Sequence, residues 1–203
     1  MTLIGASLPD FDHDVKKNNV YILIITGLVI FGILYLLSLP YLIGIMICLL
    51  AIIFYFSSHR GFTHSIFGIT ILTVLIFLII IMGSFTILSL NLKPVIVFET
   101  ALGLMILFLG LISLNKKLIL PFILLFFLGL LLLKINPVNY IMMIFSIFLG
   151  FLSHLILDSF TPMGVKILTP FSSKKFQKDF GIVMIILLVT LAIPQFIQTF
   201  LLL

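Results

Sequence analysis

The stretch VYILIITGLVIFGILYLLSLPYLIGIMICLLAIIFYFSS, residues 20–58, decides the fold class, because no charged residue interrupts it. As one helix, rising about 1.5 Å per residue, it would be nearly twice as long as the hydrocarbon core of a membrane is thick. It must therefore fold back on itself. Pro40 marks the turn, because proline lacks a backbone donor and disfavours helix at the residue before it. We expect two membrane-spanning helices, at residues 20–38 and 41–58.

The remainder of the chain has the same apolar character. Of its 203 residues, 63% are hydrophobic and 8% are charged, which gives more apolar surface than a globule of this size can bury. Further apolar runs predict spans at residues 65–83, 94–114, 118–133, 140–158 and 180–203. We therefore expect an all-α fold, a polytopic transmembrane helix bundle of about seven spans, as one membrane-embedded domain over residues 1–203.

Positive charge predicts the orientation. With seven spans, nine of the 11 basic residues lie on the face that holds the N-terminus, and such an excess marks the cytoplasmic side. The nine are Lys16, Lys17, Arg60, Lys116, Lys117, Lys166, Lys174, Lys175 and Lys178, whereas Lys93 and Lys134 lie on the other face. We expect a multi-pass protein of the cell (inner) membrane with a cytoplasmic N-terminus.

The partners follow from the same charge pattern. The lipid bilayer is the expected partner of so apolar a chain. The net charge of +5 comes without a basic stripe of interleaved aromatic residues, so we expect no nucleic-acid partner. The oligomeric state stays open at this point.

Ionisable residues gather in three clusters, which contain eight of the ten acidic and histidine residues. The clusters are Asp10, Asp12, His13 and Asp14; His59 and His64; and His154 and Asp158. The predicted spans bring all three to the same, cytoplasmic face. Carboxylate oxygen and imidazole nitrogen together are the ligand set of Zn, Mn or Fe(II). We expect a site there for one or two divalent metal ions, most simply Zn or Mn.

The third cluster lies on a predicted helix. Ser146, Gly150, His154 and Asp158 are each four residues apart, so they form one stripe on the helix surface. Small residues allow a neighbouring helix to approach closely, and ligands at positions i and i+4 are able to hold one ion. The alternative is that His154 and Asp158 only hydrogen-bond to each other or to a backbone carbonyl.

The second cluster occupies the turn between two predicted spans. Gly61 permits a loop that aims the imidazoles of His59 and His64 at one point. The alternative is a pair of interfacial histidines that reach toward lipid head groups. Arg60, between them, is suited to bind phosphate oxygens or to stabilise charge in a transition state, and its alternative role is that of an ordinary cytoplasmic anchor.

The first cluster follows a proline, which favours an extended backbone. Asp10, Asp12 and Asp14 then point to one side and repel one another unless a cation lies between them. The alternative is a solvated acidic loop or a helix N-cap.

Three strings carry a close resemblance to a known family. They are LPDFDH at residues 8–13, HRGFTHS at 59–65 and GFLSHLILDSFTPMGVKILTPF at 150–171. At these strings the chain resembles the inner-membrane, metal-dependent hydrolase family that is described as LexA-binding or YdjM-like. The resemblance implies a multi-pass bacterial or archaeal membrane protein with metal-dependent hydrolytic activity and its metal site in the segments 8–14, 59–65 and 150–171. The metal and catalytic residues that it implies are Asp10, Asp12, His13, His59, His64, His154 and Asp158.

The chain departs from the family pattern in two places. Members usually carry a longer segment, often a helix with its own histidine, ahead of the LPDxDH string, whereas seven residues precede it here. Asp14 also stands where relatives often have proline.

These observations predict a membrane-bound, metal-dependent hydrolase. The metal would lower the pKa of a bound water, Asp12 or Asp158 would accept its proton, and Arg60 would stabilise charge on the attacked group. A site at the depth of the head groups suits a phosphoester of a lipid or of a membrane-associated metabolite. Two other functions use the same ligands, namely a non-enzymatic membrane scaffold or regulator with a structural metal, and a divalent-cation transporter.

Overall fold

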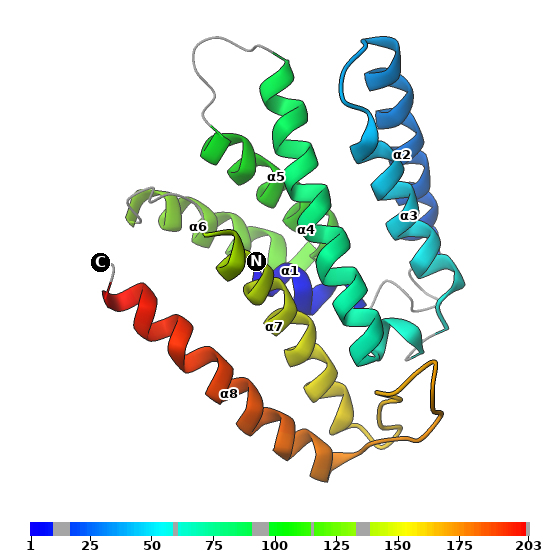
Figure 1. The fold of residues 1–203 in the computed structure, drawn as a ribbon, viewed down its shortest axis with the longest axis vertical. Coiled ribbons are helices and arrows are strands. Elements are labelled where there is room, and N and C mark those ends of the chain that lie inside the picture. The colour runs from blue at the N-terminus through cyan, green and yellow to red at the C-terminus, as the bar shows by residue number, and fades with distance from the viewer. Residues whose placement is uncertain (10–16, 59–60, 91–97, 115, 133–138, 202–203) are drawn as a thin grey trace.

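The computed structural model describes residues 1–9, 17–58, 61–90, 98–114, 116–132 and 139–201. Over these ranges the chain is helical apart from its connecting segments, so the predicted all-α class is confirmed (Figure 1). The elements are α1 (Thr2–Ser7), α2 (Lys17–Leu36), α3 (Leu42–Phe56), the 3-10 turn η3 (Phe62–His64), α4 (Ile66–Ser89), α5 (Phe98–Ser113), α6 (Lys116–Leu132), α7 (Tyr140–Ser159) and α8 (Lys178–Leu201).

The predicted fold-back near Pro40 is confirmed. Helix α2 ends at Leu36, Ser38 adopts a left-handed backbone with a φ of 54°, and α3 begins at Leu42. The two helices then pack closely against each other. A Cβ atom on Gly44 would lie 2.6 Å from the Phe31 nitrogen, so only glycine permits this approach.

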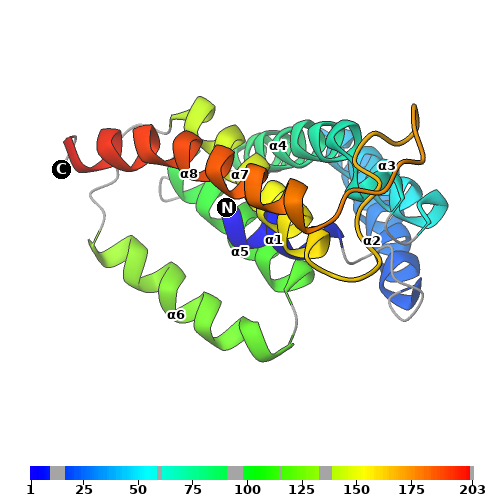
Figure 2. The same cartoon turned by 90° about the horizontal axis from the view of Figure 1, so that it is seen from below.

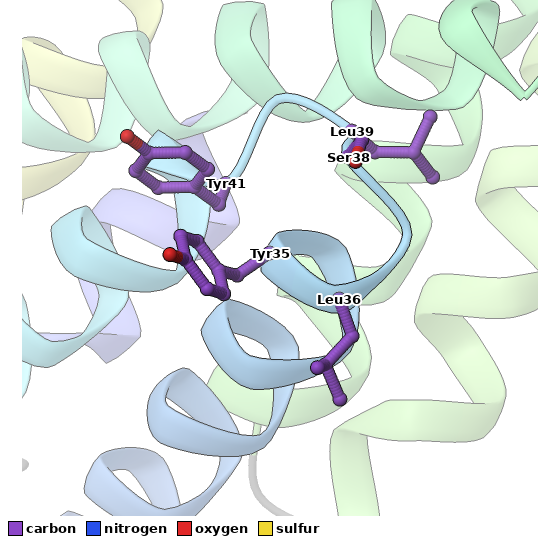
Figure 3. Close-up of a pocket in the computed structure, with 5 residues that line it drawn as sticks. All are labelled: Tyr35, Leu36, Ser38, Leu39 and Tyr41. Carbon is purple, nitrogen blue, oxygen red and sulfur yellow. The ribbon is translucent and has the colours of Figure 1, made fainter.

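A pocket of about 490 Å³ lies at this turn. Figure 3 shows its lining residues, Tyr35, Leu36, Ser38, Leu39 and Tyr41. The rings of Tyr35 and Tyr41 meet edge to face, with centroids 5.7 Å apart. Among the described residues, the lining contains no histidine, carboxylate or lysine, so His64, His154 and Asp158 lie elsewhere.

The core is built around α4 and α7. Fully buried side chains recur at helical spacing along α4, at Ile69, Leu72, Ile76, Ile79 and Ile80. Helix α7 contributes Ile147, Phe151, Leu152 and Leu155 to the same hydrophobic cluster. Figure 1 shows the start of α4 and the end of α7 at one end of the molecule, and the α2–α3 turn at the other end. This packing brings the residues before α4 close to the C-terminal half of α7.

Helix length identifies fewer membrane spans than the sequence predicts. Among the described residues, α4 and α7 are the two helices that are long and apolar enough to cross a membrane. The apolar parts of α2, α3, α5 and α6 are shorter. Figure 2 shows that α6 lies apart from the other helices. Each expected span contains one of these helices in its described part, but the crossing of a membrane stays a prediction.

Helix α1 was not predicted, and it packs into the bundle against α7. Gly5 and Gly150 face each other at this contact: a Cβ on Gly5 would collide with the Ile147 carbonyl, and one on Gly150 with the Thr2 carbonyl. The neighbouring Ile4 is fully buried. The small residue in the predicted α7 stripe thus does allow a close approach, and its neighbour is this short helix.

The segment after α7 is held by backbone hydrogen bonds. Val165 and Phe176 form an antiparallel bridge, with N–H···O distances of 2.9 and 2.8 Å. The Ile66 amide at the start of α4 donates to the Ile167 carbonyl at 3.0 Å. Gly164, with a φ of 64°, makes the turn into this bridge. The segment is therefore fixed against the start of α4.

The contact between α1 and α7 predicts the effect of a single methyl group. We expect Gly150→Ala to destabilise the protein by about 1–3 kcal/mol, because the added Cβ has to push α1 away. The control is Gly32→Ala in α2, where an added Cβ meets nothing within 4 Å. Thermal unfolding in detergent micelles measures both. A Tm for Gly150→Ala equal to that of the Gly32→Ala control would contradict the proposed packing.

Candidate metal centre

Three side-chain donors meet where α7 passes the start of α4. The Nε2 atom of His64 lies 3.1 Å from Oδ2 of Asp158, and Nε2 of His154 lies 3.5 Å from the same oxygen. The two Nε2 atoms are 3.3 Å apart. His64 ends the η3 turn, whereas His154 and Asp158 lie one helical turn apart on α7. Residues far apart in the sequence thus present three ligand atoms that lie within 4.8 Å of one another.

The distances fit a tetrahedral metal ion. Zinc binds imidazole nitrogen and carboxylate oxygen at about 2.0–2.2 Å, and the tetrahedral angle then separates neighbouring ligand atoms by about 3.3 Å. The three observed separations of 3.1, 3.3 and 3.5 Å lie on either side of this value. A proton on His64 Nε2 would satisfy only one contact at a time, whereas a cation among the three atoms satisfies all of them.

The backbone of α1 orients His154. Its Nδ1 atom lies 2.7 Å from the Ala6 carbonyl oxygen. Because a carbonyl only accepts, Nδ1 carries the proton and donates it, and in the neutral ring Nε2 keeps its lone pair. A hydrogen bond of this kind from the far ring nitrogen is typical of histidines that bind metal. The close approach of Gly5 and Gly150 is what brings Ala6 within reach.

Hydroxyl groups orient His64. Thr63 Oγ1 lies 3.1 Å from Nδ1 of His64 and accepts a hydrogen bond from the Ser57 hydroxyl at 3.3 Å. With the lone pair of His64 on Nε2, Nδ1–H donates to Thr63 Oγ1. The Ser57 oxygen also accepts the Thr63 amide at 3.3 Å. Both imidazoles of the site are therefore held at Nδ1 and present Nε2 to Asp158.

The three side chains are largely removed from water. The His64 side chain is 0% exposed, and those of His154 and Asp158 are 14% and 17% exposed. Polar groups are removed from water at a cost unless they bind partners. Two histidines and one carboxylate are the ligand set of catalytic zinc sites, in which water takes the fourth position. The residues present thus fit a divalent metal.

The other predicted site residues fall outside the described ranges. These are Asp10, Asp12, His13 and Asp14 of the first cluster, and His59 and Arg60 of the second. Their roles as ligands, as the proton acceptor or as a charge-stabilising group stay predictions. The described part of the chain unites members of the second and third clusters.

Some groups at the site were not predicted. The Ala6 carbonyl has no signature in the sequence, because every residue has such an oxygen. Thr63 and Ser57 did carry a signal, since both are hydroxyl residues within or next to the HRGFTHS string. Polar side chains adjacent to a metal-ligating histidine are candidates for its hydrogen-bond partner.

Comparison with known proteins gives a family and no individual relative. The family model described as YdjM inner membrane protein matches residues 1–114 and 118–201. No curated protein and no solved structure matches the chain. The match includes α1, η3, α4 and α7, the elements that form the site. The description names a membrane location and no activity, so hydrolysis and LexA binding are not established by it.

Replacement of a donor atom tests the centre directly. We expect the purified protein to contain zinc or manganese after equilibration with the metal, and His154→Ala and Asp158→Asn to lose it. Ser159→Ala is the control, because Ser159 is buried beside Asp158 but its hydroxyl donates to the Ile156 carbonyl. Elemental analysis measures the metal content. Equal content in all four proteins would contradict the assignment.

The hydroxyl behind His64 has a smaller expected effect. Thr63→Val removes the partner of Nδ1 while keeping the shape of the side chain, so we expect metal affinity to fall about 10–100-fold. Thr63→Ser keeps the hydroxyl and should bind metal like the unaltered protein. Competition with a chromophoric chelator measures the affinities. Identical affinities for Thr63→Val and Thr63→Ser would show that the hydroxyl does not support the ligand.

Proposed function

Because the chain belongs to the YdjM inner membrane protein family, we propose that it acts in the membrane as a metal-dependent hydrolase of phosphoesters. The observation that carries the proposal is the set of three donor atoms with separations of 3.1, 3.3 and 3.5 Å. Closed structural zinc sites have four protein ligands and are typically rich in cysteine, whereas two histidines with one carboxylate are found where zinc activates water. The single cysteine, Cys48, lies in α3 and takes no part in this set.

The residues of the chain have distinct roles in this mechanism. A bound Zn or Mn ion supplies a water of lowered pKa. His64 and His154 would hold the ion through Nε2, each oriented at Nδ1 by Thr63 or Ala6. Asp158, or Asp12 outside the described ranges, would accept the proton of the attacking water. Arg60 stabilises the charge that develops on the attacked phosphate.

The position in the membrane supports a substrate at the head groups. We propose about seven spans with a cytoplasmic N-terminus, which puts the site at the cytoplasmic face. Large apolar side chains are exposed along the helices, among them Ile22, Leu36 and Leu124 at 62%, 83% and 63%. Such surfaces suit contact with lipid tails. A phosphoester of a lipid or of a membrane-associated metabolite reaches the end of α7 without entering the hydrocarbon core.

A second function is favoured by one feature of the site. His64, His154 and Asp158, with the Ala6 carbonyl, join η3, α7 and α1, so a bound ion would also clip these elements together. A non-enzymatic scaffold or regulator with a structural metal uses that property alone. A transporter fits less well, because its sites lie near the middle of the membrane between broken helices, whereas His64 and Asp158 lie at helix ends.

Hydrolysis separates the two functions. With zinc or manganese, the purified protein is expected to cleave bis(p-nitrophenyl) phosphate or a phospholipid in mixed micelles. His154→Ala and Asp158→Asn should lower the rate at least about 100-fold, because they remove the groups that hold the ion and accept the proton. Ser159→Ala should retain activity. Equal rates in all variants would contradict the hydrolase, and metal-dependent stability without turnover would support the scaffold.

A further inference from the structure

A pocket of about 270 Å³ lies beside the η3 turn. Its lining comes from the end of α3, from η3 and from the segment after α7: Phe56, Ser57, Ser58, Gly61, Phe62, Lys166, Thr169, Pro170, Ser172 and Ser173. We propose that this pocket binds a phosphate group that is not hydrolysed. The inference rests on the proposed function, and it adds that the substrate carries a second phosphate besides the one at the metal.

The charge and chemistry of the lining suit an anion. Five of the ten described lining residues carry hydroxyl groups, and one carries an ammonium group, that of Lys166. None of its described residues is a carboxylate that would repel phosphate. Hydroxyls and an ammonium group are common donors to phosphate oxygens. Among the residues that the structure describes, none in the lining is a histidine that would serve as a base or a metal ligand.

The backbone holds Lys166 in place. Its neighbours Val165 and Ile167 are 0% and 2% exposed, and each is tied by a backbone hydrogen bond, to Phe176 and to Ile66. With both neighbours directed into the core, the half-buried Lys166 lines the pocket. A fixed backbone on both sides of the cation lowers the entropic cost of binding a ligand.

The hydroxyl groups include a donor suited to the ligand. Ser172 Oγ accepts the amide of Lys174 at 3.2 Å, so its hydroxyl hydrogen points away from that amide and is able to bind a phosphate oxygen.

The pocket and the metal centre share one hydrogen-bonded chain. Ser57 lines the pocket and donates to Thr63 Oγ1 at 3.3 Å, and Thr63 Oγ1 contacts His64 Nδ1 at 3.1 Å. The pocket thus adjoins the residues that orient His64, and in this proposal a substrate with one phosphate in the pocket carries its second phosphate to the metal. A soluble bisphosphate and a phospholipid whose head group bears a second phosphate both meet this chemical requirement.

Binding of inorganic phosphate to the zinc-loaded, full-length protein tests the inference. Isothermal titration in detergent should give saturable binding that Lys166→Met weakens at least tenfold and Lys166→Arg largely retains. The control is Lys175→Met, which removes an exposed lysine of the same segment that does not line the pocket. Metal content and Tm, measured on every variant, establish that each one is folded. No binding to the unaltered protein, or equal binding to Lys166→Met and Lys175→Met, would overturn the proposal.

Competition identifies the source of the phosphate. Micelles that contain phosphatidic acid should displace inorganic phosphate if the pocket accepts a lipid head group, and a soluble sugar bisphosphate should displace it if the pocket accepts a free metabolite. Phosphatidylcholine micelles are the control for the lipid surface. Displacement by phosphatidylcholine to the same extent as by phosphatidic acid would show that the lipid surface, and not a phosphate in the pocket, is what competes.

The two proposals fail in different ways. Phosphate binding that depends on Lys166, without any hydrolysis, would overturn the proposed hydrolase function and would still support the phosphate-binding pocket. The opposite result is metal-dependent hydrolysis of a substrate with two phosphates, with a KM that Lys166→Met does not change. It would overturn the phosphate-binding pocket and would still support the hydrolase function. Both proposals together predict that Lys166→Met raises KM for such a substrate with little change in kcat.

Discussion

Two imidazole nitrogens and one carboxylate oxygen lie within 4.8 Å of one another in a chain that is 63% hydrophobic. The His64 side chain is fully buried, so its polar atoms are separated from water and need partners within the fold. A divalent cation satisfies all three donors at once. This requirement connects the arrangement of the helices to the proposed chemistry, because each element at the site either supplies a donor or holds one in place.

The close packing of α1 on α7 has a role at this site as well as in the fold. Glycine at positions 5 and 150 lets the two backbones approach, and the approach brings the Ala6 carbonyl to Nδ1 of His154. On the other side, the tie between Ile66 and Ile167 sets the segment after α7 against the start of α4. The candidate metal centre and the pocket are thus built from backbone contacts at the middle of α7 and just after its end.

Much of the helical arrangement could be predicted from the apolar runs, because in a chain this hydrophobic the polar and helix-breaking residues gather at the turns between helices. Pro40 indicated the α2–α3 turn for a local reason, the lack of a backbone donor. Helix α1 could not be predicted in this way. Six residues without a side-chain cap form a stable helix only through tertiary packing, and that packing depends on Gly150, far away in the sequence. The pairing of His154 with Asp158 could be predicted from helical spacing. The hydrogen bond from His154 to Ala6 could not, because it is made to a backbone oxygen, which every residue has.

X-ray absorption at the zinc edge tests the central claim most directly, because it reports the atoms around the ion. On zinc-loaded protein, the account predicts a shell of nitrogen and oxygen at about 2.0–2.1 Å, the outer scattering of two or more imidazoles and no sulfur. The His64→Ala variant should lose bound zinc and, with it, the imidazole scattering. A shell of water oxygens alone, or a sulfur ligand from Cys48, would contradict the proposed centre.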